Sequence, residues 1–309
     1  MGSRRTVLVL GGGPDAEREV SLESSRCVAE ALAQGGRFDV RREVISAITR
    51  DELRALAGDV IFPVLHGGFG EGGPLQDLLV ADARPFVGCG PVAARTAMDK
   101  LATKLAAARV GVPTAPAAVF HSVDHVSPLG LPAVLKPVHE GSSVGVHICR
   151  DGDAWEAGVQ SVRADVAAHP SRVYMVERAI LGGRELTVGV LDGRALPVIE
   201  IVPKAAFYDY HAKYHSDDTK YVVSPEIPAG VGEQIQAWAL ALAREIGVRH
   251  LCRVDYILDP QGAAWLLEVN TMPGFTSHSL LPMAAAAAGI DFPRLTEKLV
   301  DLALAPARG

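Results

Sequence analysis

Cysteine is scarce in this chain of 309 residues, and its cysteines are not paired. Cys27, Cys89, Cys149 and Cys252 lie far apart and form no C-x-x-C motif. Such spacing is typical of reduced thiols in a reducing compartment. We therefore expect the four thiols to pack among apolar side chains, in preference to a nucleophilic role for any one of them.

Long apolar runs and an excess of basic residues are also absent. No stretch reaches the roughly 18 apolar residues that a transmembrane helix needs. The start, MGSRRT, superficially fits a myristoylation signal, and it also resembles the basic start of a signal peptide. The apolar run at 6–10 is, however, too short for the apolar region of a signal peptide, and it leads straight into glycines. The formal net charge of -6 argues against a nucleic-acid-binding face and gives no reason to expect an anionic membrane surface. We therefore expect a cytoplasmic protein that binds neither nucleic acid nor membrane.

The composition, 49% hydrophobic and 21% charged, is ordinary for a globular protein, and the length suggests two or three packed units. In a first unit, residues 1–95, short apolar runs alternate with helix patterns. The expected strands are residues 6–10, 40–45 and 60–65, and the expected helices are residues 15–33 and 51–57. This alternation predicts an α/β unit with a parallel sheet and helices on both of its faces.

Two further units follow. The second, residues 96–180, has an expected helix at 92–110 that Gly111-Val112-Pro113 stops, then strands at 133–137 and 144–149, a helix at 154–168 and a strand at 172–177. The third, residues 181–309, has expected strands at 185–191, 196–202, 253–258 and 264–269, and helices at 232–246, 280–288 and 292–304. The chain has no internal repeats.

A glycine loop, Gly11-Gly12-Gly13-Pro14-Asp15-Ala16, follows the first expected strand. It fits the G-x-G-x-x-A form of the dinucleotide fingerprint, but the second strand carries Arg41 and Arg42 where that fingerprint needs an acid. A nicotinamide cofactor is therefore disfavoured. Two interpretations remain open: the loop brings Glu17 to a helix N-terminus that faces a ligand, or it is a tight turn with a helix-capping acid.

A second loop joins Lys136 to a glycine- and serine-rich segment, residues 136–145. Small residues let backbone N–H groups approach phosphate oxygens, and a lysine supplies a compact positive charge. The segment is not a P-loop, because the GK[ST] signature is missing. The alternative is a flexible hairpin.

The strongest pattern combines Arg253 and Asp255 with Glu268 and Asn270. They lie on two apolar runs separated by a turn at 259–262, which predicts a hairpin. Residues two apart share one face of a strand, and oxygen ligands in this arrangement suit Mg²⁺, which also takes ligands from nucleotide phosphates. The alternative is a surface salt bridge between Arg253 and the acids.

Two further segments are rich in polar residues and show no clear period. Residues 207–218 are polar and aromatic together, which suits a closing lid, or else a plain surface loop. Residues 270–279 lead to a helix that Ser279 could cap, and backbone donors there could hold a carboxylate or an oxyanion. The Ser277-His278-Ser279 run suggests a hydrolase, but no G-x-S-x-G elbow is present.

Taken together, ordered blocks over nearly the whole chain resemble the D-alanine–D-alanine ligases of the ATP-grasp superfamily. The matching blocks are AEREVS (16–21), LHG with a following GEGG (65–73), MDK (98–100), LKPVHEGSSVG (135–145), FYDYHAKY (207–214), CRVDYIL (252–258) and LLEVNTMPGFTSHSLLP (266–282). The resemblance implies a three-domain α/β ATP-grasp fold with an N-terminal Rossmann-like domain, and ATP held between the second and third domains.

The resemblance also implies a role for each matching residue. ATP would be bound by Lys100, Lys136, Gly141, Ser142, Ser143, Glu177, Glu185 and Lys213, with Glu177 near the adenine and Glu185 at the ribose. Two Mg²⁺ ions, with Mn²⁺ as an alternative, would be held by Asp255, Glu268 and Asn270. The first D-alanine would be held by Glu17 and His66, and the carboxylate of the second by Ser279 and Leu280. Ser142 and Tyr214 would link to Glu17, while Arg253 and the Gly274 N–H would stabilise an oxyanion.

The implied reaction joins two D-alanines into D-alanyl-D-alanine through an acyl phosphate, giving ADP and phosphate, for peptidoglycan precursor synthesis. The partners implied are D-alanine and ATP, in a homodimer. A ligase that makes D-alanyl-D-lactate or D-alanyl-D-serine is the nearest alternative; a more distant ATP-grasp enzyme and a nucleotide-binding regulator are the others. Two departures stand out: Gly72 replaces a family acid, and the stretch 177–185 is about one residue longer than in some relatives, which blurs the adenine contacts near Ile180 and Leu181.

Overall fold

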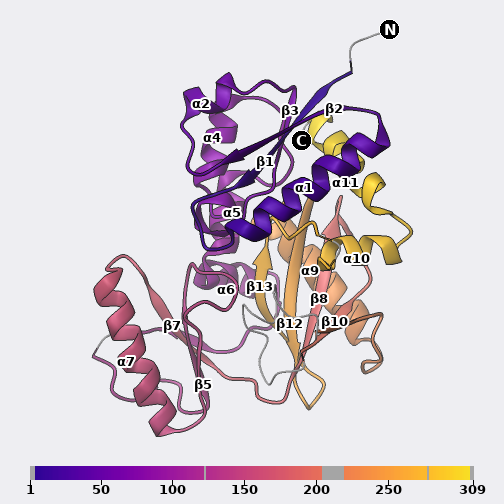
Figure 1. Ribbon diagram of the computed structural model, residues 1–309. Coiled ribbons are helices and arrows are strands. Elements are labelled where there is room, and N and C mark those ends of the chain that lie inside the picture. Colours follow the sequence, from indigo (N-terminus) through magenta and orange to yellow (C-terminus); the bar gives the residue numbers. More distant parts are fainter. Residues whose placement is uncertain (1–3, 122, 204–218, 277, 307–309) are drawn as a thin grey trace.

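Separate β-sheets, each with its own helices, make up the mixed α/β fold of the computed structural model (Figure 1). The structure describes residues 4–121, 123–203, 219–276 and 278–306. The predictions for Lys213, Tyr214 and the whole of the proposed lid, residues 207–218, therefore lie outside the described residues, as does the one for Ser277. Within the described part, no helix is long and apolar enough to cross a membrane.

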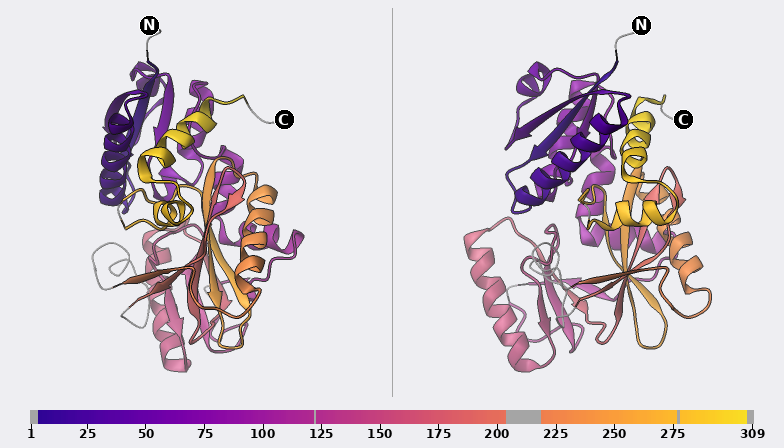
Figure 2. Two further views of the ribbon diagram at one scale, coloured as in Figure 1. Left: turned by 90° about the vertical axis from the view of Figure 1, so that its right-hand side faces the viewer. Right: turned by 45° about the vertical axis from the view of Figure 1, so that its right-hand side comes forward.

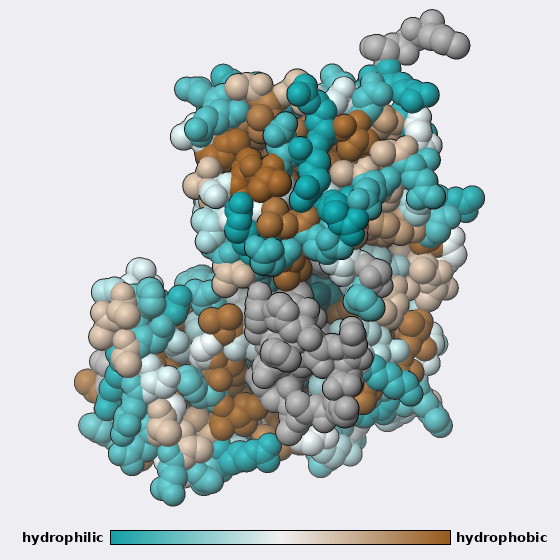
Figure 3. Space-filling view, in the orientation of Figure 1, coloured by the Kyte–Doolittle hydropathy of each residue, from teal (hydrophilic) through white to brown (hydrophobic). Residues whose placement is uncertain are grey.

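The first sheet has the order β2-β1-β3 and all of its pairings are parallel, as predicted. Its strands are β1 (Thr6–Gly12), β2 (Asp39–Ile45) and β3 (Val60–Pro63). Its helices are α1 (Arg18–Gly35), α2 (Arg50–Ala55), α3 (Gly67–Gly70) and α4 (Pro74–Asp82). The helices cover both faces, because Val7 and Val9 pack with the core of α1 while Leu8 and Leu10 pack with α2 and α4. Hydrophilic side chains cover the outward face of α1 (Figure 3).

The helix predicted at 92–110 is two helices, so that prediction was wrong in its continuity. α5 (Pro91–Met98) and α6 (Lys100–Arg109) meet at Asp99, whose ψ of 106° is not helical. The Asp99 side chain accepts hydrogen bonds from the N–H groups of Leu101 and Ala102 at 2.8 and 2.9 Å. An aspartate in this position starts a new helix because it satisfies donors that have no partner within the helix. The break places Lys100 in the first turn of α6.

The second sheet has the order β4-β7-β5-β6 and is antiparallel. Its strands are β4 (Ala117–Val119), β5 (Ala133–Pro137), β6 (His147–Cys149) and β7 (Tyr174–Arg178), and α7 (Gly152–Ala168) lies along it (Figure 1). β6 begins three residues later than predicted. The reason is that Gly145 has a φ of 69°, which extended backbone does not adopt, and it continues the turn of Ser142 and Ser143, whose φ angles of 51° and 59° are also positive.

The third sheet has the order β11-β10-β8-β12-β13, with β9 paired to β8. Its strands are β8 (Arg184–Leu191), β9 (Arg194–Ala195), β10 (Ile199–Val202), β11 (Lys220–Val223), β12 (Leu251–Leu258) and β13 (Ala264–Asn270). The strand predicted at 196–202 is shorter in the structure, where β10 begins at Ile199, and the short strand β9 comes before the predicted range. The helices that follow are α9 (Val231–Ile246), α10 (Leu280–Ala287) and α11 (Phe292–Leu304).

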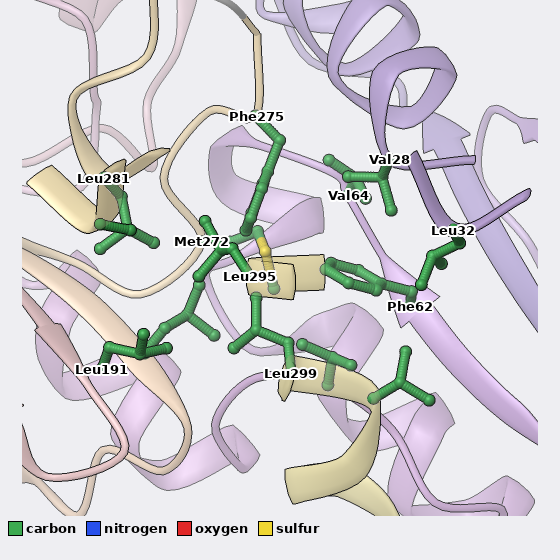
Figure 4. Close-up of a cluster of buried hydrophobic side chains, with 14 of the residues drawn as sticks. Val28, Leu32, Phe62, Val64, Leu191, Met272, Phe275, Leu281, Leu295 and Leu299 are labelled. Atoms are coloured by element: carbon green, nitrogen blue, oxygen red, sulfur yellow. The ribbon is translucent and has the colours of Figure 1, made fainter. Parts of the chain in front are cut away.

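A shared apolar core ties the third sheet to the first. Figure 4 shows Met272 and Phe275, which follow β13, lying among side chains of the N-terminal sheet and of α11. The rings of Phe62 and Phe275 meet edge to face with centroids 5.5 Å apart. α11 lies alongside α1 (Figure 2), and Arg37 pairs there with Asp301. The segment that follows β13 therefore packs between the N-terminal sheet and the C-terminal helix α11.

Candidate active site

Two adjoining pockets lie where elements of the three sheets approach one another. The first pocket is lined by Glu17, His66, Glu71, Arg253 and Gly274, among others. The second is lined by Lys136, Glu177, Glu185, Ile180 and Leu181, among others. Among the described residues, both pockets are lined by Lys100, Glu140, Arg253 and Glu268. A notch in the molecular surface separates the part that holds the N-terminal sheet from the part that holds α7 (Figure 3).

Glu17 meets the glycine- and serine-rich loop of the second sheet. It occupies the N-cap position of α1, but its side chain makes no capping hydrogen bond, so the interpretation of Glu17 as a helix-capping acid was wrong. Its carboxylate accepts a hydrogen bond from the hydroxyl of Ser142 instead. A Cβ added to Gly141 would lie 3.7 Å from both carboxylate oxygens of Glu17. The loop at 141–143 therefore closes onto the first sheet as well as bordering the second pocket.

His66 and Glu71 together hold the backbone of Met272. The Nδ1 atom of His66 lies 2.9 Å from the Met272 carbonyl oxygen, and the Glu71 carboxyl accepts from the Met272 N–H at 3.2 Å. A carbonyl oxygen can only accept, so Nδ1 carries a hydrogen, and Nε2 of the neutral ring is then an acceptor. Nε2 is buried and has no hydrogen-bond partner among the described residues. A ligand in the first pocket could therefore donate a hydrogen bond to Nε2 of His66.

Burial shifts both of these titratable groups toward their neutral forms. Desolvation is the main reason that the pKa of His66 is below its ordinary value. Desolvation, with a further contribution from the charge of Glu17, raises the pKa of Glu71 to about 8. Sequence reasoning assigned no role to Glu71, although it lies in the GEGG block beside His66. Its partner, Met272, is 201 positions away, and only the fold reveals it.

The loop around Glu71 explains the glycine that replaces the family acid. A Cβ at Gly72 would lie 2.3 Å from the carbonyl oxygen of Gly68, so this backbone has no space for a side chain there. The Glu71 carboxyl also accepts from the Gly67 N–H at 3.3 Å, which keeps the loop closed.

β12 and β13 form the predicted hairpin, on which the candidate metal ligands lie. Arg253 pairs with Asn270 and Asp255 with Glu268 in the antiparallel register, and a β-bulge follows directly after Asp255. Bulges re-aim side chains near functional sites. Arg253 binds Asp255 with Nε–Oδ1 and Nη2–Oδ2 distances of 2.9 and 2.8 Å, and Thr187 donates to Oδ1 at 2.6 Å. The predicted salt bridge therefore exists, but its side chains are only 15% and 12% exposed, so it is not a surface pair.

The remaining candidates lie around this hairpin. Lys100 donates to the Glu140 carbonyl at 2.5 Å and lies 3.7 Å from a carboxylate oxygen of Glu268. Ser279 stands at the N-cap position of α10 without a side-chain capping bond; its hydroxyl accepts from the Thr276 N–H at 2.9 Å instead, so the predicted cap was wrong. Leu280 begins α10 and lines the first pocket.

Residues 109–301 match a family model described as "D-ala D-ala ligase C-terminus". The chain is similar to the D-alanine–D-alanine ligase of Anaeromyxobacter sp. (strain K), with 41% identity over 303 residues, 96% of each chain. It is 40% identical over 305 residues to that of Actinobacillus pleuropneumoniae serotype 5b, covering 96% of this chain and 97% of the relative. It is also 40% identical over 310 residues to that of Burkholderia multivorans, covering 96% of each chain.

Proposed function

The chain belongs to the D-alanine–D-alanine ligase family and is therefore a ligase; we propose that it joins two D-alanine molecules into D-alanyl-D-alanine and converts ATP to ADP and phosphate. The likeness to curated ligases over 96% of the chain carries this proposal. The shared wall of the two pockets supports it. Lys100, Arg253 and Glu268 face both pockets, so a phosphate group in one and a carboxylate in the other would meet between them.

The finer architecture follows from the same proposal. The chain would form a three-domain ATP-grasp fold, with a Rossmann-like N-terminal domain at 1–95, a small central subdomain at 96–180 and a C-terminal subdomain at 181–309. The parallel β2-β1-β3 sheet supports the Rossmann-like part. The second pocket lies between the other two sheets and would hold ATP.

The second pocket offers groups suited to a nucleotide. Lys100 and Lys136 would contact its phosphates, and residues 141–143 would fold over them. Lys213, which lies outside the described residues, would also contact the phosphates. Glu177 would lie near the adenine and Glu185 at the ribose. Ile180 and Leu181 line the same pocket and would border the base. Apolar walls with few placed polar groups are the usual composition of such sites.

Asp255, Glu268 and Asn270 fit a magnesium site that a nucleotide completes. Among the described residues, no group of three or more His, Cys, Asp or Glu side chains could hold a metal by itself. Mg²⁺ needs no such group, because it binds through one or two carboxylates together with water and substrate phosphates. Two carboxylates and an amide oxygen on adjoining strands supply that set for two Mg²⁺ ions, or Mn²⁺. The bound metal would offset the negative charge of the phosphates as the carboxylate approaches.

The first pocket would hold both amino acids. Glu17 would bind the ammonium of the first D-alanine, with Ser142 keeping its carboxylate in place and Tyr214 completing that link, while His66 would lie near the substrate carboxylate. Ser279 and Leu280 would bind the carboxylate of the second D-alanine. The side chain of Ser279 does not cap α10, so the first N–H groups of that helix are not satisfied by it and favour an anion.

The reaction follows from these positions. A carboxylate oxygen of the first D-alanine attacks the γ-phosphorus of ATP, the bond to the bridging oxygen breaks and ADP leaves. The amine of the second D-alanine, after losing a proton, attacks the carbonyl carbon of this acyl phosphate. Arg253 and the Gly274 N–H would stabilise the oxyanion, and collapse of the intermediate expels phosphate. A Cβ at Gly274 would lie 2.7 Å from the Ser279 hydroxyl, so a side chain there would disturb this arrangement.

An acceptor series tests the proposal. Purified protein with Mg²⁺ and ATP should release ADP only when D-alanine is present, and D-alanyl-D-alanine should be the product. Parallel reactions with D-lactate or D-serine as second acceptor test the nearest alternative. Mainly D-alanyl-D-lactate with both acceptors present would overturn the choice of product but not the ATP chemistry. No ADP release with any of these acceptors would point to a regulator.

The assembly and location are also proposals. We propose a homodimer in the cytoplasm, and light scattering coupled to size-exclusion chromatography measures the oligomeric state directly. A monomer at assay concentrations would contradict the dimer.

A further inference from the structure

A buried ion cluster lies in and behind the wall of the second pocket. Lys136 and Glu177 line this pocket, and both are almost fully buried. The Lys136 Nζ atom lies 2.6 Å from one carboxylate oxygen of Glu177. The Nζ atom of Lys104 lies 2.5 Å from the other oxygen. Lys104 has no role in the proposed site, and it approaches Glu177 from behind the lining residues.

The fold fixes all three side chains. In the antiparallel register Glu177 of β7 faces Val134 of β5, so Lys136, two residues further on, lies on the same side of the sheet as Glu177. Lys104 follows Lys100 by one turn of α6 and therefore lies on the same face of that helix. Its ammonium also donates to the Ala115 carbonyl at 2.8 Å, which anchors it to the segment before β4.

The two lysines keep the carboxyl group of Glu177 ionised. Burial alone would raise the pKa of Glu177, but the two lysines outweigh it, and the net effect is a lowered pKa. Glu177 therefore stays a carboxylate that two ammonium groups share. With Lys104 present the cluster carries a net positive charge. Without it, Glu177 would neutralise Lys136, and this part of the wall of the pocket would attract phosphate less strongly.

We propose that Lys104 is a positioning residue of the nucleotide site, an inference that rests on the proposed function. It holds the Glu177 carboxylate from behind, keeps its orientation toward the pocket, and leaves part of the charge of Lys136 for the nucleotide. A purely structural ion pair between α6 and the second sheet is the competing explanation. That explanation predicts lower thermal stability but unchanged nucleotide affinity in the folded protein.

The test compares one substitution at two places. Lys104→Met removes the ammonium from the cluster. Lys298→Met is the matched control, because Lys298 of α11 also forms an ion pair, with Asp192 at 2.8 Å, but lines neither pocket. Lys104→Arg keeps the charge, and Lys104→Gln keeps a donor without it. Melting curves identify the folded variants, titration calorimetry gives the dissociation constant of MgATP, and steady-state kinetics give KM for ATP and for D-alanine.

We expect Lys104→Met to raise the dissociation constant and KM for ATP by roughly tenfold or more, as losing one partner of a buried charge cluster does. KM for D-alanine should change by less than about twofold, since D-alanine binds in the other pocket. Lys104→Arg should restore most of the affinity, and Lys298→Met should bind MgATP like the wild type. If Lys104→Met does not fold, Lys104→Gln carries the same expectation.

Wild-type affinity for MgATP in a folded Lys104→Met or Lys104→Gln variant would overturn the inference and leave the proposed function intact. A wild-type protein that binds no MgATP would instead overturn the proposed function, and this inference with it. The two failures are therefore distinguished by the wild-type titration alone.

Discussion

Replacing Glu71 with glutamine should change how the stability of the protein depends on pH. Glu71 is 7% exposed, and its carboxyl accepts hydrogen bonds from the N–H groups of Gly67 and Met272. Burial and the charge of Glu17 raise its pKa from the ordinary 4.5 to about 8 in the folded protein. Glutamine has nearly the same shape and cannot ionise. The variant should therefore stay neutral at every pH, with one of the two hydrogen bonds altered, because an amide nitrogen cannot accept.

The sign and size of the effect follow from linkage. A raised folded pKa means that stability from this group is fully present below about pH 4.5 and is lost as pH rises through about 8. At about 1.4 kcal/mol for each pH unit between these values, the ionised carboxyl would cost about 3–5 kcal/mol of unfolding free energy at high pH. Near pH 5 the two proteins should differ by only about 1 kcal/mol, which is typical of one altered hydrogen bond.

Urea denaturation of both proteins between about pH 5 and pH 9 measures this difference. The wild type should lose stability relative to Glu71→Gln as pH rises, with most of the change between about pH 5 and pH 8 and little further change above that. Glu19→Gln, which alters an exposed carboxyl of α1, serves as the control and should follow the wild type. Parallel curves for the wild type and Glu71→Gln over the whole range would refute the reasoning, because Glu71 would then titrate alike in the folded and unfolded states.

Three further predictions concern the proposed chemistry. Glu268→Gln should remove most activity and the stabilisation by MgATP while the melting temperature without ligand changes little; near-normal turnover would contradict its role as a metal ligand. Glu17→Gln should raise KM for D-alanine far more than KM for ATP, and unchanged values of both would show that Glu17 does not contact the substrate. Tyr214→Phe should raise the share of D-alanyl-D-lactate when both acceptors are present, more so at lower pH where the competing amine is protonated; an unchanged product ratio by chromatography would contradict it.

Local patterns predicted elements whose burial follows a simple period. The β12–β13 hairpin is an example, because its apolar runs and the turn at 259–262 specify both strands; the structure adds that Asp255 and Glu268 pair across it. The short apolar run at 6–10 likewise predicted a buried strand, and it forms β1 of the parallel sheet. In both segments the information is local, since it depends only on which residues must face a core.

Features that depend on distant partners could not be predicted in this way. At Asp99 the chain can either continue one helix or cap a new one. Good helix formers on both sides of Asp99 favour a continuous helix in a sequence-based prediction, so the break was not predicted. Glu71 and Lys104 look like ordinary polar residues in their own segments. Their partners are Met272, which follows a strand of the third sheet, and Glu177 of the second sheet. The contacts of Glu71 and Lys104 can therefore be recognised only in the folded chain.

An isotope experiment tests the central claim most directly, which is that a carboxylate in the first pocket attacks ATP in the second. D-Alanine labelled with ¹⁸O in its carboxyl group is incubated with the wild-type protein, Mg²⁺ and ATP, and the released phosphate is analysed by mass spectrometry. An acyl phosphate transfers one carboxyl oxygen to phosphate for each dipeptide formed, so each phosphate should carry one ¹⁸O atom. Dipeptide formation with unlabelled phosphate would contradict the account.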